Sequence, residues 1–391
     1  MINGTGRKRR VTTIPALIGV LIPSFIVAVL NISAVMISTG MAEPPDAKRG
    51  APESQHVQVT VRSDRQTQVV RGEVRARAAD GGMVLIGDDG RLWILQPDQY
   101  DGVTPIDRPP SPGPDEIASR LRAEGLPPHQ SFETAHYVIV HNGNEKYARS
   151  LSLLLEQLHR GFHTFWKNKR VKLSTPEVPL VAIGFANRAS YESYARPRIG
   201  EVSDQFIGFY NIQSNRMICH DGPNWERSVA TVVHEATHQL AFNTGLQDRL
   251  ADNPKWLSEG MALFFETPDL TRPGRWNAVG QINPINHARW WRYFSRRPAG
   301  SLRSMIGSDA RFEDASTAEA AYGEAWALTY YLLRTRGNDY ARYLSEIRDT
   351  SPSQVLAPEQ RIDMFTSIFG DLESVDRALV TYMKRFAPPR R

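Results

Sequence analysis

The sequence predicts an α+β protein, in which a small β module precedes a larger region that combines a twisted sheet with helices. Three patterns support this fold class. Residues 57–96 contain stretches that alternate apolar and polar side chains with the period of two expected of strands. Residues 130–217 interleave strand-like segments with amphipathic helical ones, and the chain after residue 225 has mainly helical periodicity.

The N-terminal 42 residues predict export. A run of four basic residues, Arg7 to Arg10, is followed by a stretch from Val11 to Ala42 without a charged residue. This order is typical of a secretory signal peptide, and Gly40-Met41-Ala42 supplies the small residues of a cleavage site. The uncharged stretch is also long enough to span a bilayer, which takes about 20 residues. Residues 1–42 are therefore either removed or kept as a membrane anchor, which makes the protein periplasmic, cell-surface or membrane-anchored.

A linker and a small β module are expected next. Residues 43–56 are polar and contain prolines, which predicts a linker. In residues 57–100, two apolar runs at 82–86 and 91–95 flank Gly-Asp-Asp-Gly and predict a hairpin. Residues 101–129 open with five closely spaced prolines, so we expect a proline-rich linker with a short helix.

Charge and cysteine content narrow the class of partner. The net charge is +5, and residues 1–50 contribute +4 of it through six basic and two acidic groups, which leaves about +1 for the rest. We therefore expect no nucleic-acid partner. A single cysteine, Cys219, excludes an intramolecular disulfide.

Residues 130–391 are predicted to form one domain, with a sheet followed by a helical lobe and a cleft between them. Apolar runs predict the strands, and i, i+3, i+4 stripes predict the helices. The strands are expected over residues 136–140, 178–183 and 206–217, and the helices, besides two motif helices, over residues 145–166, 190–195, 319–335, 337–348 and 372–386.

The most informative motif is His234-Glu235-Ala236-Thr237-His238. Residues four apart lie one turn apart on one helix face, so both imidazoles can point at one metal ion. Glu235 is rotated by about 100° from His234, so it faces a water on the ion rather than the ion itself and can remove a proton from that water. An apolar stripe beside the histidines predicts that this helix is packed on one side: Val229, Val232, Val233, Ala236 and Leu240.

Glu259 is the predicted third ligand, 21 positions after His238. Asn253 is the expected N-cap and Pro254 the expected first residue of a second helix that ends near residue 266. A connection rich in helix breakers can bring this helix against the first one. Catalytic zinc sites keep three protein ligands and one open position. The predicted ligands of one Zn2+ ion are His234, His238 and Glu259.

The two helix strings resemble the gluzincin zinc metallopeptidases. They are HEATHQ at residues 234–239 and WLSEGMALFFE at residues 256–266, and they look like the aminopeptidase-like branch. They are also similar to uncharacterised exported bacterial proteins with a HEATH helix. The resemblance covers roughly residues 130–385. It implies a zincin-like catalytic domain, a zinc cofactor, Glu235 as the general base and a peptide or protein substrate.

The resemblance also points to Tyr322. The string at residues 321–328 resembles the family helix whose leading tyrosine donates a hydrogen bond to the tetrahedral oxyanion, and such a donor stabilises the developing charge. Tyr322, Trp326 and Tyr330 also recur at i, i+4 and i+8, which is typical of a buried helix face. The sequence leaves both interpretations open.

One stretch departs from the aminopeptidase branch. Those enzymes carry a Gly-x-Met-Glu-Asn string whose glutamate holds the free amine of the substrate, whereas residues 208–220 contain no glutamate. They predict two short strands around a turn, with an edge strand that can pair with an extended peptide. We therefore expect internal cleavage. His220, at the end of this stretch, contacts substrate, serves as an extra ligand, or does neither. Glu266, two turns after Glu259, either supports the metal site, caps its helix or is a solvated surface residue.

Three functions fit these observations. The first is an exported zinc-dependent endopeptidase. The second is another zinc hydrolase with the same helix motif, such as a deformylase, in which Cys219, 15 residues before His234, would be a ligand. The third is a non-catalytic surface binding protein that keeps a structural zinc. The intact Glu235 argues against the third function, because a structural site has no use for a base.

Overall fold

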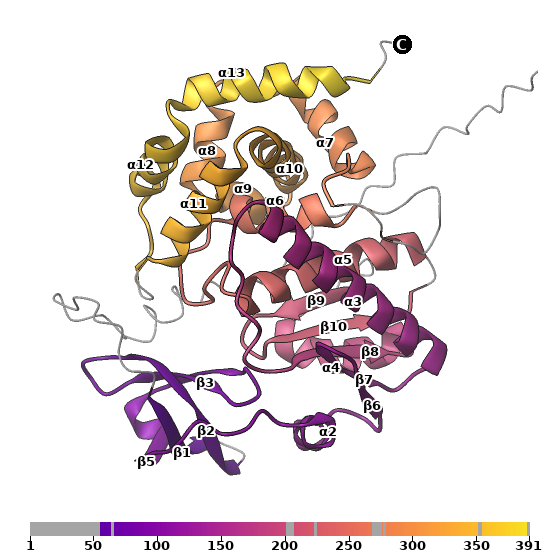
Figure 1. The fold of residues 1–391 in the computed structure, drawn as a ribbon, viewed down its shortest axis with the longest axis vertical. Coiled ribbons are helices and arrows are strands. Elements are labelled where there is room, and N and C mark those ends of the chain that lie inside the picture. The colour runs from indigo at the N-terminus through magenta and orange to yellow at the C-terminus, as the bar shows by residue number, and fades with distance from the viewer. Residues whose placement is uncertain are drawn as a thin grey trace, which may run out of the picture.

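The computed structural model describes residues 55–63, 66–200, 207–222, 225–267, 276, 279–350 and 354–388. The predicted signal peptide or membrane anchor therefore lies outside the described residues, as does nearly all of the predicted linker at 43–56. Within the described ranges, no helix combines the length and apolar character needed to cross a membrane. These ranges form an α+β structure in three tiers: an N-terminal sheet, a second sheet flanked by helices, and a C-terminal helical lobe (Figure 1).

The N-terminal β module is a five-stranded antiparallel sheet in the order β4-β3-β2-β1-β5. Alternate side chains of β1, such as Val57, Val59 and Val61, are buried in its core. The sheet continues past the predicted end of the module, because β5 pairs with β1 and occupies the start of the predicted proline-rich linker. Pro105 is tolerated there because β5 is an edge strand. The strands are β1 (His56–Ser63), β2 (Gln66–Arg77), β3 (Met83–Gly87), β4 (Leu92–Leu95) and β5 (Tyr100–Pro105).

The second sheet has the order β6-β7-β8-β10-β9. Strands β7, β8 and β10 are parallel, whereas β6 and β9 run antiparallel at the two edges. A parallel sheet needs cover on both faces. Tyr137 and Ile139 of β7 pack with α3 and α5, and Val138 and Val140 pack with α2 and α4 on the other face. The elements are α2 (Pro114–Ala123), β6 (Gln130–Glu133), β7 (Tyr137–His141), β8 (Leu180–Phe185), α4 (Arg188–Ile199), β9 (Gly208–Asn211), β10 (Arg216–His220) and α5 (Trp225–Asn243).

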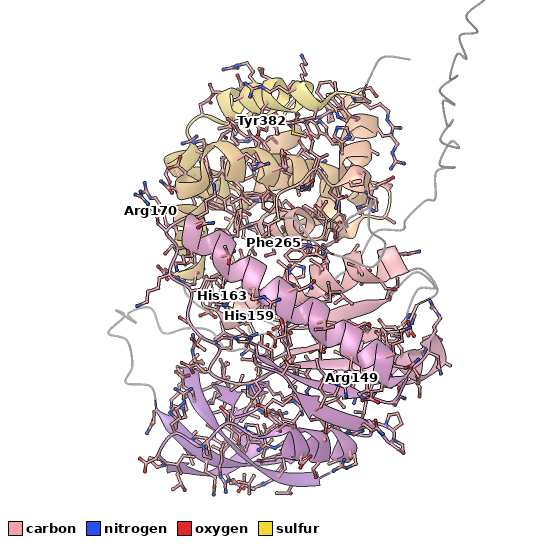
Figure 2. The ribbon with its side chains drawn as sticks, turned by 45° about the vertical axis from the view of Figure 1, so that its right-hand side comes forward. Arg149, His159, His163, Arg170, Phe265 and Tyr382 are labelled. Carbon is pink, nitrogen blue, oxygen red and sulfur yellow. The ribbon has the colours of Figure 1, made fainter. Side chains whose placement is uncertain are left out.

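Helix α3 (Glu145–Asn168) links the second sheet to the helical lobe. Asn144 caps it, because its side chain accepts a hydrogen bond from the Lys146 N–H. Figure 2 shows the helix rising from Arg149, beside the sheet, to Arg170, just past its end and close to the lobe. Its predicted apolar face is buried, with Leu151, Leu154, Leu155 and Leu158 in the core.

The helical lobe is built around α10 (Ala318–Thr335), which packs mainly against α6 and α7. Tyr322, Trp326 and Tyr330 are all buried in it, as the aromatic stripe predicts. Helices α7, α8, α9 and α12 are not among the elements that the sequence patterns predict. The lobe comprises α6 (Lys255–Phe265), α7 (Pro284–Phe294), α8 (Ser301–Gly307), α9 (Ala310–Glu313), α10, α11 (Gly337–Arg348), α12 (Pro358–Phe369) and α13 (Leu372–Met383).

The start of α6 differs from the prediction by one residue. Pro254, not Asn253, is its N-cap. The Asn253 amide is used elsewhere, since it donates to the carbonyl oxygens of Asp248 and Ala251. The Lys255 N–H in the first turn is bound instead by a side chain of the lobe, Asp309 Oδ1, at 2.9 Å. A tertiary contact has therefore replaced the local cap.

Candidate metal centre

Helix α5 carries the HExxH motif between the second sheet and α6. The predicted apolar stripe is buried, and Val229, Val233 and Leu240 belong to the main core cluster. Gln239, the residue after His238, fixes the helix on the sheet. Its amide nitrogen donates to the carbonyl oxygens of Val181 at 3.1 Å and Asn215 at 2.9 Å.

Helix α6 brings Glu259 to the histidines, because it packs between α5 and α10. Gly260 allows α6 to pack closely against α10. A Cβ atom at this position would collide with the Thr329 hydroxyl and would lie 2.8 Å from the Ala325 carbonyl oxygen of α10. The glycine after Glu259 is therefore required by helix packing, and this packing sets the position of the glutamate.

The three predicted ligands meet in one buried cluster. His234 Nε2 lies 3.2 Å from Glu259 Oε2 and 3.3 Å from His238 Nε2, and His238 Nε2 lies 3.7 Å from Glu259 Oε1. All three residues are at most 1% exposed. Among the described residues, they form the group whose ligand atoms lie close enough together to hold a metal ion.

The charges around this cluster favour a cation. Three buried carboxylates, Glu235, Glu259 and Glu266, surround two imidazoles. Burial lowers the pKa of His238 to about 4, so this imidazole is neutral at physiological pH and its nitrogen lone pair is available. Burial opposes the charge of Glu259, but the hydrogen bond from His234 outweighs it and holds the pKa of this carboxyl below its ordinary value. Buried negative charge needs a partner, and a metal ion between these atoms would supply it.

Glu266 supports His234 from behind. Its Oε2 lies 2.8 Å from His234 Nδ1, so the Nδ1–H donates to the carboxylate and Nε2 is turned into the cluster. The other oxygen, Oε1, accepts hydrogen bonds at 2.9 Å from the amides of Asn283 and Asn286. Asn286 Oδ1 in turn accepts from Arg289 Nη1 at 2.9 Å. The residue is also the C-cap of α6.

Sequence reasoning did not find the three residues of α7 behind Glu266. Asn283, Asn286 and Arg289 recur every three residues around Pro284, a spacing that could have indicated one polar helix face. The spacing does not identify Glu266 as the residue that they bind, because Glu266 lies 17 residues before Asn283.

Glu235 lies beside the cluster and is 2% exposed. Its Oε2 accepts a hydrogen bond of 2.8 Å from the backbone N–H of Tyr210 in β9. Burial raises the pKa of Glu235 to about 7, although the charge of His234 and the Tyr210 hydrogen bond act in the opposite direction. A carboxyl group with this pKa can both take up and release a proton near neutral pH.

Tyr322 reaches the same region from α10 and is 3% exposed. Burial raises its pKa well above the ordinary value, and the nearby Glu259 and Glu235 carboxylates raise it further. The phenol therefore keeps its proton at neutral pH and can act as a hydrogen-bond donor. Its ring also packs edge-on against Phe312, so the helix-core interpretation holds as well.

The other candidates lie outside the metal-binding group. His220 is the buried last residue of β10, where Nδ1 lies 3.0 Å from the Asp221 carbonyl oxygen and the ring packs on Tyr191. Cys219 is fully buried with its sulfur 3.2 Å from the Tyr147 hydroxyl, and burial raises the pKa of the thiol to about 12. Neither residue belongs to the described group that could hold a metal ion.

The chain matches one protein family, which is described as "Protein of unknown function (DUF1570)", over residues 228–354. The matched segment begins within α5 and ends beyond α11, so it contains both motif helices and Tyr322. No curated protein matches the chain. The segment that is similar to this family therefore includes the buried His-His-Glu group that could hold a metal ion.

Proposed function

We propose that the protein is an exported zinc-dependent peptidase of the gluzincin type. One observation carries the proposal: a buried glutamate, Glu235, lies beside a buried His-His-Glu cluster. Two imidazoles and one carboxylate form a common donor set of catalytic zinc sites. Donor atoms at about 2.0–2.1 Å from a tetrahedral ion lie roughly 3.3 Å apart. The distances of His234 Nε2 from the other two donor residues, 3.2 and 3.3 Å, agree with this spacing.

Glu235 is the group that we assign as general base. A zinc ion in the cluster would lower the pKa of a water ligand to about 7 and polarise a substrate carbonyl. With its own pKa raised to about 7, Glu235 can accept a proton and then deliver it to the leaving amine. The Tyr210 N–H holds one oxygen of this carboxylate in place. Tyr322, as a neutral phenol, would donate to the oxyanion that forms on the substrate.

Internal cleavage fits the surroundings better than removal of a terminal residue. Strand β9 lies at the edge of the second sheet, where an extended peptide can be added. Two glutamates that could have held a substrate amine are already engaged. Glu266 binds His234 and two asparagines, and Glu324 is fully buried between Arg297 and Arg311.

The other zinc-hydrolase interpretation has less support. A deformylase-like site needs the cysteine as a metal ligand, and Cys219 is instead paired with the Tyr147 hydroxyl. For a non-catalytic zinc protein, the buried and base-like Glu235 would have no purpose, because a structural site is closed by its ligands alone.

A cleavage assay with a matched pair of variants tests the proposal. Purified wild type should cleave a mixture of unstructured proteins, and Glu235→Gln should retain zinc yet lose at least about 10²-fold in turnover, as expected for a lost general base. Glu192→Gln is the control, because Glu192 pairs with Arg188 on α4 and is not part of the site. Equal turnover of wild type and Glu235→Gln, or absence of cleavage by zinc-loaded wild type, would contradict the proposal.

A further inference from the structure

We propose that the N-terminal β module is a positioning part of the active site. It clamps the β9–β10 hairpin, and this hairpin holds the Glu235 carboxylate through the Tyr210 N–H. The catalytic consequence rests on the proposed function, whereas the positioning of Glu235 does not.

The first step is the hairpin itself. Within the described part of the chain, β9 pairs with β10 and with no other strand, so no described strand holds its outer edge. The Tyr210 N–H donates to Glu235, 2.8 Å away, instead of taking part in a ladder. Tyr210 is fixed through its side chain, because its hydroxyl donates to Asn215 Oδ1 at 2.8 Å and its ring stacks on Phe242 of α5. The place of the Glu235 oxygen thus depends on where this hairpin lies.

The second step is the contact of the module with the hairpin. Val84 of β3 and Leu92 of β4 share one apolar cluster with Tyr210 and Ile212. The Leu92 N–H donates to the Gln213 carbonyl oxygen at 2.7 Å, which joins the edge of the module to the hairpin turn. The module therefore covers the side chain of the same tyrosine whose backbone binds Glu235.

The third step is the Arg249 guanidinium, which contacts both the β module and the β9–β10 hairpin. Arg249 is 8% exposed, and its Nη1 donates to the Gly90 carbonyl oxygen of the β3–β4 turn at 2.7 Å and lies 3.4 Å from the Ile212 carbonyl oxygen. No carboxylate of the described residues forms an ion pair with it, so these two carbonyl groups hold its guanidinium. A second tie, the buried Arg216 of β10, pairs with Glu124, the C-cap of α2, at 2.5 Å and with Asp89 of the β3–β4 turn at 3.5 Å.

Gly90 makes the close approach of the two parts possible. It has a φ of +79°, and a Cβ atom there would meet Asn215 Nδ2 at 2.6 Å and Val178 Cγ2 at 2.8 Å. Asn215 is the residue that holds the Tyr210 hydroxyl. Gly102 of β5 is a matched control in the same module: its φ is also positive, at +61°, but a Cβ atom there would meet nothing within 4 Å. Alanine at either position carries similar backbone strain, and only Gly90→Ala pushes on the hairpin.

The test measures backbone hydrogen exchange of the full chain at residues 208–212, together with kcat, KM and zinc content. Glu235→Ala removes the acceptor and so identifies the exchange signal of the Tyr210 amide. Gly90→Ala should speed exchange of this amide about 10-fold and lower kcat by at least about 10-fold, the scale of a displaced catalytic group, with KM and zinc content unchanged. Gly102→Ala should match the wild type in all four measurements.

Two results would overturn the inference: exchange in Gly90→Ala equal to that in Gly102→Ala, or a loss of kcat without faster exchange at Tyr210. Faster exchange in a protein whose wild type cleaves no peptide would support the positioning and refute the proposed function, so the two failures are distinct. If Gly90→Ala does not fold, Arg249→Met removes the clamp instead. Its control is Arg75→Met, which breaks only a partly exposed ion pair with Asp248 at the same seam, and the same two results apply to this pair.

Discussion

His234 is held on both sides, and this arrangement explains why one imidazole can serve as a metal ligand. Glu266 accepts from its Nδ1, which turns Nε2 toward His238 and Glu259, where a metal ion would take the place of the proton that Glu259 accepts. The two oxygens of Glu266 are thereby fully used, one by the histidine and one by the asparagines of α7. We infer that Glu266 sets the orientation and the basicity of the ligand rather than binding the metal itself.

Glu266→Gln should weaken zinc binding about 10- to 100-fold, because it removes the negative charge that supports His234. Competition with a chelator measures the affinity. Glu346→Gln is the matched control, since Glu346 pairs with Arg342 on the exposed face of α11 and lies outside the site. Equal zinc affinity of Glu266→Gln and wild type would show that this carboxylate does not support the ligand.

At the scale of single elements, the sequence predicts the helices that carry a long stripe at helical spacing but not the shortest ones. Helices α3, α5 and α10 have long stripes at helical spacing, and the structure has α3 and α10 within a few residues of their predicted bounds. Helices α8 and α9 are only seven and four residues long, too short for such a stripe. Helix α7 has a local start signal, because Asn283 is its N-cap and Pro284 is its first residue.

In the candidate site, too, local sequence patterns predict some contacts and not others. The two histidines are four residues apart on one helix, so their meeting follows from local geometry. Glu259 was predicted from a second string and an assumed helix contact, which the α5–α6 packing now supplies. The Tyr210 N–H could not be predicted, because a backbone group has no sequence signature. Its role depends on how the hairpin lies on α5.

An acid-sensitive contact is expected where α3 meets the start of β7. Three imidazoles stack there: the ring centroids of His136 and His159 are 3.6 Å apart, and those of His159 and His163 are 4.3 Å apart. Burial lowers the pKa of His159 to about 4, and the charges of His136 and His163 act in the same direction, opposed by Glu156. The ordinary pKa of histidine is about 6.5, so between about pH 6.5 and 4 the unfolded chain binds more protons than the folded one.

The free energy of unfolding should therefore decrease as the pH falls from about 6.5 to about 4. His159→Phe keeps a ring but cannot bind the proton, so it should lose less stability than the wild type between about pH 7.5 and about pH 5. Urea unfolding of both proteins at the two pH values measures this difference. An equal loss in both proteins would mean that His159 does not titrate in the stack.

The edge strand β9 predicts how substrates are selected. Residues 208–220 contain no carboxylate side chain. Glu266 and Glu324 are engaged by other groups. A free amine at the end of a peptide should therefore contribute little to binding. Acetylating the N-terminus of a cleaved peptide should leave kcat/KM nearly unchanged. A complete loss of cleavage would instead show that an acidic group anchors the amine, as in aminopeptidases.

At the scale of the whole molecule, we expect the N-terminal segment to determine where the protein acts. Residues 1–42 are expected to direct export, and the β module, the second sheet and the lobe follow them. N-terminal sequencing of the mature protein separates the two forms. A start at Glu43 means cleavage of a signal peptide, whereas an intact Met1 in the membrane fraction means an anchor. Full-length protein in the soluble cytosol would contradict export in either form.

The proposed function depends on a metal ion bound where α5, α6 and α10 meet. Three tiers of the chain converge there: α5 rests on the second sheet, α6 and α10 belong to the lobe, and the hairpin beside Glu235 contacts the module (Figure 1). The most direct test is elemental analysis of the purified protein together with His234→Ala and His238→Ala. The account predicts one zinc ion per wild-type chain and loss of zinc in both variants. Substoichiometric metal in the wild type after zinc addition, or full zinc occupancy in either variant, would contradict it.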